Sequence, residues 1–310
     1  MRVASVTFLI TAMLVMAQKA DGVPLNAKLT QSLPVFYDSA LAAKGFPSPL
    51  VKARIGGHEA LFIIDSGASV NVLANWYAKV AEIPTWTETG STARGSGGKT
   101  TPVRTVHRLQ GHWSNGQGFT LKEAIVVAFP PLFETLHLGG LLSPQLLAPE
   151  GTAAVLDLRI PSLEFKPFAR AMSDLHLSRA IKVPQPVCRN PDSHFVNRVY
   201  LAPITTAGVT DLVLVDTGAT KTIVAADSKI GQAIETDSEL GPHSEGIGGE
   251  VDGRRIARDV QLLRGGKTIG LSPSIGEVSS SCNAKGLLGM DALRNCLLVL
   301  GKDEMAFRCK

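Results

Sequence analysis

The stretch that decides the fold is LFIIDSGAS at residues 61–69, because a second copy, LVLVDTGAT, occurs at residues 212–220. The two copies match position by position at one offset of 151 residues, so that Asp65 falls on Asp216. Four apolar residues precede each aspartate, which is typical of a strand buried on both faces. The sequence therefore predicts two halves of the same design, each of which delivers one aspartate from the end of a buried strand.

The repeat extends to both sides of the aspartates. Turn candidates at residues 55–60 and 206–211, each preceded by a further β-type run, predict that a β-hairpin opens each half. Strand-like runs at residues 155–165 and 297–307 close the halves. Each half is thus expected to form a lobe rich in β-strands.

A glycine cluster, GSGGKT at residues 95–100, looks at first like the end of a phosphate-binding loop. The first glycine of that motif is absent, because its position holds Ala93, and the preceding residues are polar rather than a buried strand. At the offset of 151 residues the cluster corresponds to GIGG at residues 246–249, where Glu250 replaces the lysine. We therefore interpret the two clusters as equivalent hairpin tips and not as a nucleotide site.

Composition points to a globular, all-β protein. The chain has 310 residues, 45% of them hydrophobic and only 19% charged, with 30 Gly and 18 Pro, which favours short strands joined by tight turns. The net charge of +4 is spread along the chain, and aromatic residues make up 5%. No basic cluster with stacking aromatics is present, so nucleic-acid binding is not expected.

The N-terminus predicts export. Arg2 precedes an apolar run over residues 3–16, and small residues follow at a position that suits signal peptidase. We assign residues 1–20 to a signal peptide and expect a secreted or periplasmic protein. An uncleaved membrane anchor is the alternative, disfavoured because the run is short for a bilayer span.

All four cysteines lie in the second half of the chain. In an oxidising compartment one or two disulfides are expected among Cys188, Cys282, Cys296 and Cys309, with three pairings possible if all four are joined. The spacings do not form paired CxxC knuckles, and no HExxH occurs, so neither a zinc site nor any other metal or cofactor is expected.

Two carboxylates delivered to one interface by symmetric lobes form an acid and a base side by side. Their mutual repulsion keeps one protonated while the other is ionised. The ionised carboxylate takes a proton from a water molecule that attacks an amide carbon, and the protonated one hydrogen-bonds the carbonyl oxygen. Such chemistry needs no covalent intermediate. The sequence leaves open which aspartate is the base.

With these motifs the chain resembles the pepsin and retropepsin superfamily of aspartic proteases. The resemblance rests on DSGA at 65–68, DTGA at 216–219, the two glycine clusters, and the matching segments GLLSPQLL at 140–147 and GLLGMDAL at 286–293. It covers nearly all of the chain beyond the signal peptide. Within it, the short lobes and the GIGG cluster are closer to the retropepsin style, fused into one chain, than to pepsin itself.

The resemblance implies a site residue by residue. Asp65 and Asp216 would be the catalytic pair. Supporting groups would be Ser66, Gly67, Thr217 and Gly218, with the two hydroxyls gripping the opposite lobe. Substrate-binding flaps would be formed by Ser96, Gly97, Gly98, Ile247, Gly248 and Gly249.

The resemblance also implies the architecture: two similar retropepsin- or pepsin-like β-barrel lobes with a cleft between them and one short helix per lobe. We expect an N-terminal lobe over residues 21–167, a connector over 168–190 and a C-terminal lobe over 191–310. The connector is either a plain linker or holds a short amphipathic helix. The expected protein is a monomer whose partner is a polypeptide substrate.

Two departures from the family pattern stand out. Ser143 occupies the position at which the second half has Gly289, so the packing beneath Asp65 is expected to differ. Neither flap carries the tyrosine of pepsin-like enzymes, since Tyr77 and Tyr200 fall elsewhere. His107 and His112 are interpreted as surface or structural residues.

The leading hypothesis is an aspartic endopeptidase that cuts extended peptides around apolar residues. The alternative is a catalytically silent relative that binds peptides or proteins, for which Ser143 leaves room. A homodimerising scaffold is the third hypothesis.

Overall fold

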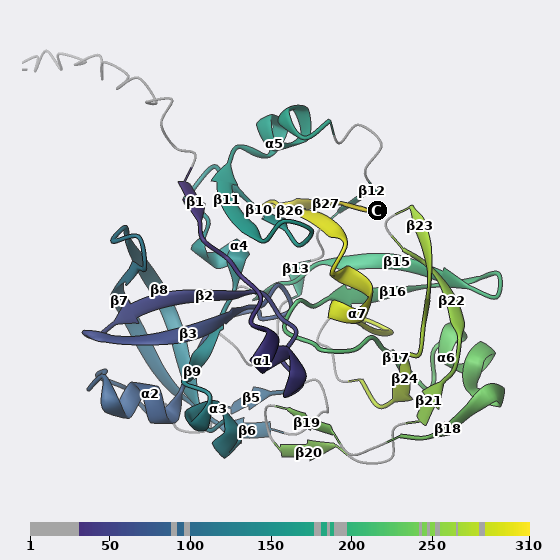
Figure 1. Ribbon diagram of the computed structural model, residues 1–310, viewed down its shortest axis with the longest axis horizontal. Coiled ribbons are helices and arrows are strands. Elements are labelled where there is room, and N and C mark those ends of the chain that lie inside the picture. Colours follow the sequence, from purple (N-terminus) through teal and green to yellow (C-terminus); the bar gives the residue numbers. More distant parts are fainter. Residues whose placement is uncertain are drawn as a thin grey trace, which may run out of the picture.

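The computed structural model describes residues 31–87, 92–95, 100–176, 181–184, 187–188, 197–241, 244–246, 249–251, 255–264, 266–278 and 283–310 (Figure 1). The expected signal peptide at residues 1–20 lies outside these ranges. No helix in the described ranges is long and apolar enough to cross a bilayer.

The first lobe is built on a closed barrel. In order around the barrel, its strands are β2 (Leu50–Ile55), β3 (His58–Ile64), β9 (Leu138–Leu142), β4 (Asn71–Ala74), β8 (Gly118–Val127) and β7 (Arg104–Trp113). The expected opening hairpin is present as β2 and β3, whose turn residues Gly56 and Gly57 both have positive φ. Such a turn matches the twist of the two strands that it joins.

The second lobe repeats this arrangement in a nine-stranded sheet. The order is β18 (Ser238–Leu240), β21 (Arg255–Ala257), β24 (Ser274–Gly276), β17 (Ile223–Ala225), β25 (Gly286–Leu288), β16 (Val209–Val215), β15 (Leu201–Thr206), β22 (Val260–Arg264) and β23 (Lys267–Leu271). β16 runs parallel to β25, which is antiparallel to β17, as β3 runs parallel to β9 and β9 antiparallel to β4. The repeat found in the sequence is therefore a repeat of topology.

A six-stranded sheet joins the lobes. Its order is β1 (Gln31–Leu33), β11 (Ser162–Lys166), β10 (Ala153–Asp157), β26 (Cys296–Leu300), β27 (Glu304–Cys309) and β12 (Ile181–Pro184). The two hairpins that close the lobes meet at the centre, where β10 pairs with β26. Figure 1 shows this sheet above and between the lobes.

Two small hairpins lie at the opposite edge of the view in Figure 1. One consists of β5 (Thr92–Arg94) and β6 (Thr100–Pro102), the other of β19 (Ser244–Gly246) and β20 (Gly249–Val251). A third, β13 (Val187–Cys188) with β14 (Asn197–Arg198), precedes the second lobe. Of the two glycine clusters, Gly95 follows β5, Thr100 begins β6 and Gly246 pairs with Gly249, while the other cluster residues lie outside the described residues.

The helices are short and lie at connections. They are α1 (Ser39–Ala43), α2 (Asn75–Val80), α3 (Pro131–Thr135), α4 (Pro144–Leu147), α5 (Phe168–Asp174), α6 (Lys229–Ile234) and α7 (Met290–Leu293), with a 3₁₀ turn η2 (Glu235–Asp237). The expectation of one short helix per lobe is wrong in number, since the described residues hold four in the first lobe and two in the second. One- or two-turn helices are too short to show a 3.6-residue period in the sequence.

The connector is more than a plain linker. Of the two forms left open by the sequence, the helix is present as α5, and the same segment also contains β12. β12 pairs with β27 at one edge of the joining sheet, while β1 pairs with β11 at the other. The segment thus contributes a strand to the sheet shared by both lobes.

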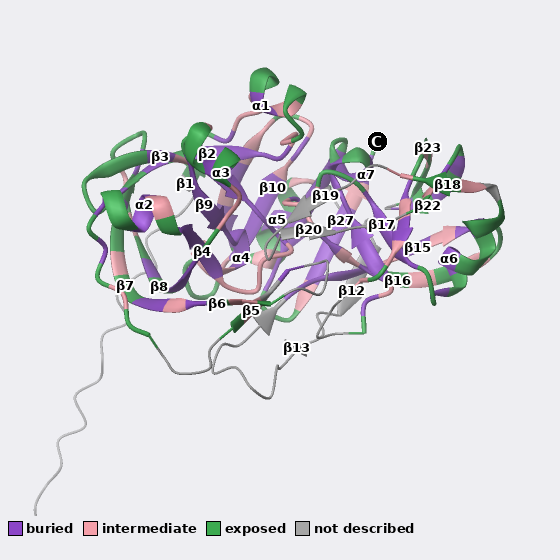
Figure 2. Cartoon of the chain, turned by 90° about the horizontal axis from the view of Figure 1, so that it is seen from below, coloured by how far each residue is buried: buried purple, intermediate pink, exposed green. Residues whose placement is uncertain are grey.

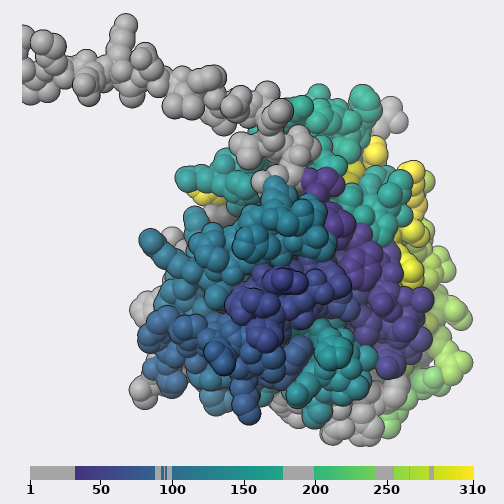
Figure 3. Space-filling view, turned by 60° about the vertical axis from the view of Figure 1, so that its left-hand side comes forward, coloured from purple at the N-terminus to yellow at the C-terminus, as the bar shows by residue number. Residues whose placement is uncertain are grey.

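The core runs through both lobes. One cluster of buried apolar side chains includes Leu73 in the barrel, Leu298 in the joining sheet and Val213 in the second lobe, each with none of its surface exposed. Figure 2 shows buried residues along the inner strands of both lobes and exposed residues on the outer turns and helices. In Figure 3 the first lobe fills the near side and the yellow C-terminal strands lie behind it. Burial of this extent fixes the lobes against each other.

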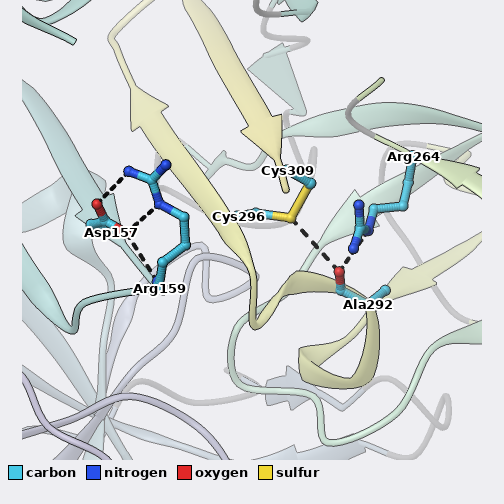
Figure 4. The surroundings of a disulfide bond; sticks show 6 residues. All are labelled: Asp157, Arg159, Arg264, Ala292, Cys296 and Cys309. Carbon is cyan, nitrogen blue, oxygen red and sulfur yellow. Dashed lines mark hydrogen bonds and ion pairs between the residues drawn. A yellow bond between two sulfur atoms is a disulfide. The ribbon is translucent and has the colours of Figure 1, made fainter. Parts of the chain in front are cut away.

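One disulfide is present among the described residues, between Cys296 and Cys309 (Figure 4). The two residues face each other in the register of β26 and β27. The bond therefore closes the end of the hairpin that belongs to the joining sheet. Cys188 lies in β13, and Cys282 lies outside the described residues.

Candidate active site

Asp65 and Asp216 occupy equivalent positions at the ends of β3 and β16. The N–H of Asp65 donates to the carbonyl of Leu142 at 2.9 Å, and the N–H of Asp216 donates to that of Leu288 at 3.1 Å. The parallel neighbours β9 and β25 thus fix where each aspartate leaves its strand. This is the placement that the sequence repeat predicts.

The loop after each strand wraps around the carboxylate. Asp65 Oδ1 accepts hydrogen bonds from the N–H groups of Gly67 at 2.8 Å and Ala68 at 3.1 Å. Asp216 Oδ1 accepts from Gly218 and Ala219, both at 2.9 Å. Backbone donors aimed at a carboxylate favour its charged form and fix its orientation.

Each loop glycine faces the aspartate of the other lobe. A Cβ on Gly67 would lie 2.5 Å from Asp216 Cγ, and a Cβ on Gly218 would lie 2.5 Å from Asp65 Cγ. Real Cβ atoms do not approach other atoms this closely, so only glycine lets the two carboxyl groups meet. The reciprocal contact brings Asp65 and Asp216 together at the interface of the lobes.

The predicted hydroxyl grip is present. Thr217 Oγ1 donates to the Ile64 carbonyl at 2.6 Å and accepts from the Ser66 N–H at 3.0 Å. Ser66 Oγ donates to the Val215 carbonyl at 2.7 Å and accepts from the Thr217 N–H at 3.1 Å. Both hydroxyl side chains are fully buried. Four hydrogen bonds across the interface therefore set the spacing of the two aspartate loops.

The two carboxyl groups titrate as a pair. Burial raises the pKa of Asp65 well above its ordinary value of 3.8, and the charge of Asp216 together with the hydrogen bond between the carboxyls raises it further. Burial also raises the pKa of Asp216, but there the hydrogen bond from Asp65 acts in the opposite direction. Both shifts favour a state in which the two carboxyl groups share one proton.

Ser143 keeps the backbone hydrogen bond that supports the structure beneath Asp65. Its N–H donates to Asn71 Oδ1 at 3.0 Å, as the N–H of Gly289 donates to Thr222 Oγ1 at 3.2 Å in the second lobe. Ser143 Oγ is buried and has no hydrogen-bond partner among the described residues. The first lobe therefore keeps the supporting hydrogen bond and carries an unpaired hydroxyl beside it.

Four supporting residues were not identified from the sequence, namely Asn71, Gln145, Thr222 and Asp291. Gln145 Nε2 donates to backbone carbonyls of the Asp65 loop, and Asp291 Oδ1 accepts from Thr222. A signal was available for all four, since Asn71 falls on Thr222 and Gln145 on Asp291 when the repeat is extended. Gln145 and Asp291 occupy equivalent positions but act differently, because the Gln145 amide donates hydrogen bonds whereas the Asp291 carboxylate accepts them.

The flap residues are only partly described. Ser96, Gly97, Gly98, Ile247 and Gly248 lie outside the described residues, while Gly249 begins β20. Their strands are in place, with Arg94 paired to Thr100 and Gly246 paired to Gly249. The assignment of these residues to substrate-binding flaps therefore stays a prediction.

The hydroxyl groups of the two tyrosines donate to backbone carbonyls and not to the aspartates. Tyr77 is buried and its hydroxyl donates to the Ile55 carbonyl at 2.9 Å, and the Tyr200 hydroxyl donates to the Gly301 carbonyl. His107 and His112 are exposed. In the described ranges no group of three or more His, Cys, Asp or Glu side chains is arranged to hold a metal ion.

Comparison with known proteins agrees with this geometry. Residues 51–142 match a family model described as aspartyl protease. No curated protein sequence matches the chain.

Among solved structures, the aspartic proteinase from Irpex lacteus is similar over 91% of this chain and 97% of its own, with a TM-score of 0.50 and 12% identity. Conglutin gamma from lupine seeds is similar over 91% of this chain and 95% of its own, with a TM-score of 0.48 and 11% identity. Basic 7S globulin from soybean is similar over 90% of this chain and 94% of its own, with a TM-score of 0.47 and 10% identity.

Proposed function

From the pepsin- and retropepsin-like aspartic protease fold of this chain, we propose that it is an aspartic endopeptidase that hydrolyses peptide bonds in extended polypeptides. The observation that carries the proposal is the reciprocal contact of Gly67 with Asp216 and Gly218 with Asp65. It leaves two carboxyl groups, and no side chain between them, at the interface of the lobes.

The chemistry follows from the protonation of the pair. The ionised carboxylate of the Asp65–Asp216 pair removes a proton from a water molecule as the water oxygen attacks the peptide carbonyl carbon. The protonated carboxyl gives its proton to the carbonyl oxygen, which produces a neutral tetrahedral diol. The first carboxyl then passes its proton to the amide nitrogen while the second takes one back from a diol hydroxyl, so the C–N bond breaks and the pair returns to its starting state.

Substrate binding is assigned to the two hairpins. The tips at Ser96–Gly98 and Ile247–Gly249 would close over a peptide from both lobes. Glycine-rich tips suit backbone hydrogen bonding to an extended chain, because little side-chain bulk separates the two backbones. Both lobes belong to one chain, so a monomer already holds both aspartates.

We also propose that the protein is exported. The basic residue and apolar run at the N-terminus support this location, as does the Cys296–Cys309 disulfide, since disulfides persist in oxidising compartments.

The test is cleavage of a diverse peptide mixture by the purified protein at acidic and neutral pH, with Asp65→Asn and Asp216→Asn run in parallel. Both variants keep an oxygen that accepts the loop N–H bonds, so we expect them to fold and to produce no cuts. Folding is checked by circular dichroism and thermal unfolding.

Two outcomes contradict the proposal. Cuts that persist at full rate in either variant would mean that the aspartates do not share the chemistry. No cuts at any pH from folded wild-type protein would instead favour the catalytically silent, peptide-binding relative.

A further inference from the structure

The two aspartate loops are supported by different donors. In the second lobe, the carbonyl of Ala219 accepts a hydrogen bond from the backbone N–H of Met290 at 2.9 Å. Met290 is the first residue of α7, and such a residue has an N–H that no partner within the helix can accept. The helix N-terminus thus holds the loop that carries Asp216.

In the first lobe this donor is missing. The residue equivalent to Met290 is Pro144, the first residue of α4, and proline has no backbone N–H. The carbonyl of Ala68, equivalent to that of Ala219, accepts instead from Gln145 Nε2 at 3.1 Å. The same Nε2 also donates to the Ser66 carbonyl at 3.2 Å.

Gln145 therefore supports the Asp65 loop through the backbone carbonyls of Ser66 and Ala68. Its amide spans the carbonyls on either side of Gly67, while the N–H groups of Gly67 and Ala68 point to Asp65. Gln145 is 3% exposed, so water cannot readily replace it. The side chain of the equivalent Asp291 does not donate to the loop carbonyls of the second lobe. Its carboxylate instead accepts hydrogen bonds from the Thr222 N–H at 2.9 Å and from Thr222 Oγ1 at 2.7 Å.

We propose that Gln145 is a positioning residue for Asp65, whose side-chain amide replaces the backbone donor that Pro144 removes. The inference rests on the proposed function only where activity is measured. Its structural part, the coupling of residues 144 and 145 through the Ala68 carbonyl, stands independently.

The test is a double-mutant cycle. Gln145→Met keeps a similar volume without a donor, and Pro144→Met supplies the backbone N–H found in the second lobe. We expect Gln145→Met to lower kcat about 10- to 100-fold with little change in KM, because misplacement of a reacting group by about 1 Å costs this much. In the Pro144→Met background the same change should cost less than about threefold.

A second readout does not depend on proteolysis. Hydrogen exchange at the N–H groups of Gly67 and Ala68, measured by NMR, should accelerate in Gln145→Met and return toward the wild-type rate in the double variant. If wild-type protein proves inactive, this exchange result still supports or overturns the coupling. Equal effects of Gln145→Met in both backgrounds, or unchanged exchange, would overturn it.

A further variant covers the case in which Gln145→Met does not fold. The protonated carboxylic acid of Gln145→Glu can donate one hydrogen bond, whereas the ionised form cannot. Its kcat relative to wild type, and its Gly67 and Ala68 exchange rates, should therefore approach wild-type values at low pH and depart from them as the pH rises. A ratio that does not change with pH would contradict the proposal.

Discussion

Gly67 and Asp216 come from opposite lobes, yet a Cβ on Gly67 would lie only 2.5 Å from Asp216 Cγ. Gly218 stands in the same relation to Asp65. The glycines are thus required by contact across the interface and not only by the turn that each loop makes. No φ in the left-handed region occurs at either glycine, so the constraint is steric.

Gly67→Ala and Gly218→Ala should each lower kcat/KM at least about 100-fold, because the new methyl group must push the opposite carboxyl away. Gly118→Ala is the matched control. A Cβ at Gly118 meets nothing closer than 3.8 Å, and its activity should stay within about twofold of wild type. Normal activity in Gly67→Ala would show that the carboxyls are not in contact with these loops during the reaction.

The pH dependence of stability should reveal the proton that the two aspartates share. The folded-state pKa of Asp65 is raised by burial and by Asp216, so its contribution to stability is complete below an unfolded pKa of about 4 and is lost as pH rises through the folded value. The amide introduced by Asp65→Asn does not titrate. The Tm of Asp65→Asn minus that of wild type should therefore grow from acidic toward neutral pH, as measured by thermal unfolding.

Asp157→Asn provides a control of opposite sign. Burial raises the pKa of Asp157, but the hydrogen bonds and charge of Arg159 outweigh it and hold the pKa below 3.8 (Figure 4). Its stabilisation is present above the unfolded pKa and is lost as pH falls through the folded value. Asp157→Asn should thus lower Tm at neutral pH and have less effect at acidic pH. The same trend in both variants would contradict the raised pKa of Asp65.

Thr217 tests the grip between the lobes. Thr217→Val removes the hydroxyl and leaves the Ile64 carbonyl and the Ser66 N–H unpaired in a buried site. We expect the free energy of unfolding to fall by about 2–5 kcal/mol in urea denaturation. Thr217→Ser keeps the oxygen and loses one methyl group, so its cost should be about 1 kcal/mol. Equal costs would mean that the methyl group, and not the hydrogen bonds, carries the stabilisation.

The predictable parts of the fold are those that a short stretch of sequence specifies and that occur in both halves of the chain. The apolar strand, the aspartate and the glycine recur at one offset, so the repeat alone predicts where Asp65 and Asp216 lie. The hairpin at Gly56 and Gly57 was predictable for the same reason, since a two-residue turn of this kind is set by neighbouring residues.

The parts that were not predictable depend on contacts across the chain. The pairing of β10 with β26 joins residues 140 to 146 positions apart, from Asp157 with Leu297 to Ala154 with Leu300, and nothing local specifies it. The role of Gln145 was missed because it follows from the donor that Pro144 lacks. Ser143 was expected to alter the packing beneath Asp65, but its N–H donates to Asn71 as the N–H of Gly289 donates to Thr222 in the second lobe.

The Cys296–Cys309 disulfide should stabilise the sheet that joins the lobes. It closes a short loop of sequence separation 13 and links residues that are both buried. Replacing both cysteines by alanine should lower the free energy of unfolding by about 2–4 kcal/mol, measured by thermal unfolding without reductant. Wild-type protein with a reductant should approach the double variant if the bond can be reached. A change below about 1 kcal/mol would show that the β26–β27 hairpin needs no covalent link.

Ser143 and Gly289 should respond in opposite ways to substitution, although they occupy equivalent positions. Ser143 Oγ is buried without a partner among the described residues, so Ser143→Ala removes a desolvated hydroxyl and should raise the free energy of unfolding by about 1 kcal/mol. A Cβ at Gly289 would lie 2.5 Å from the carbonyl carbon and oxygen of Lys221, which are backbone atoms and cannot move aside like a side chain.

Gly289→Ser should therefore lose several kcal/mol of stability, on the order of the largest effects of single substitutions, and should lose activity with it. Urea denaturation and peptide cleavage of the two variants, compared with wild type, measure both effects. Because Ser143→Ala keeps the N–H bond to Asn71, its activity should stay near the wild-type value. Loss of activity in Ser143→Ala without loss of stability would mean that the Ser143 hydroxyl acts on the Asp65 loop, contrary to the geometry described above.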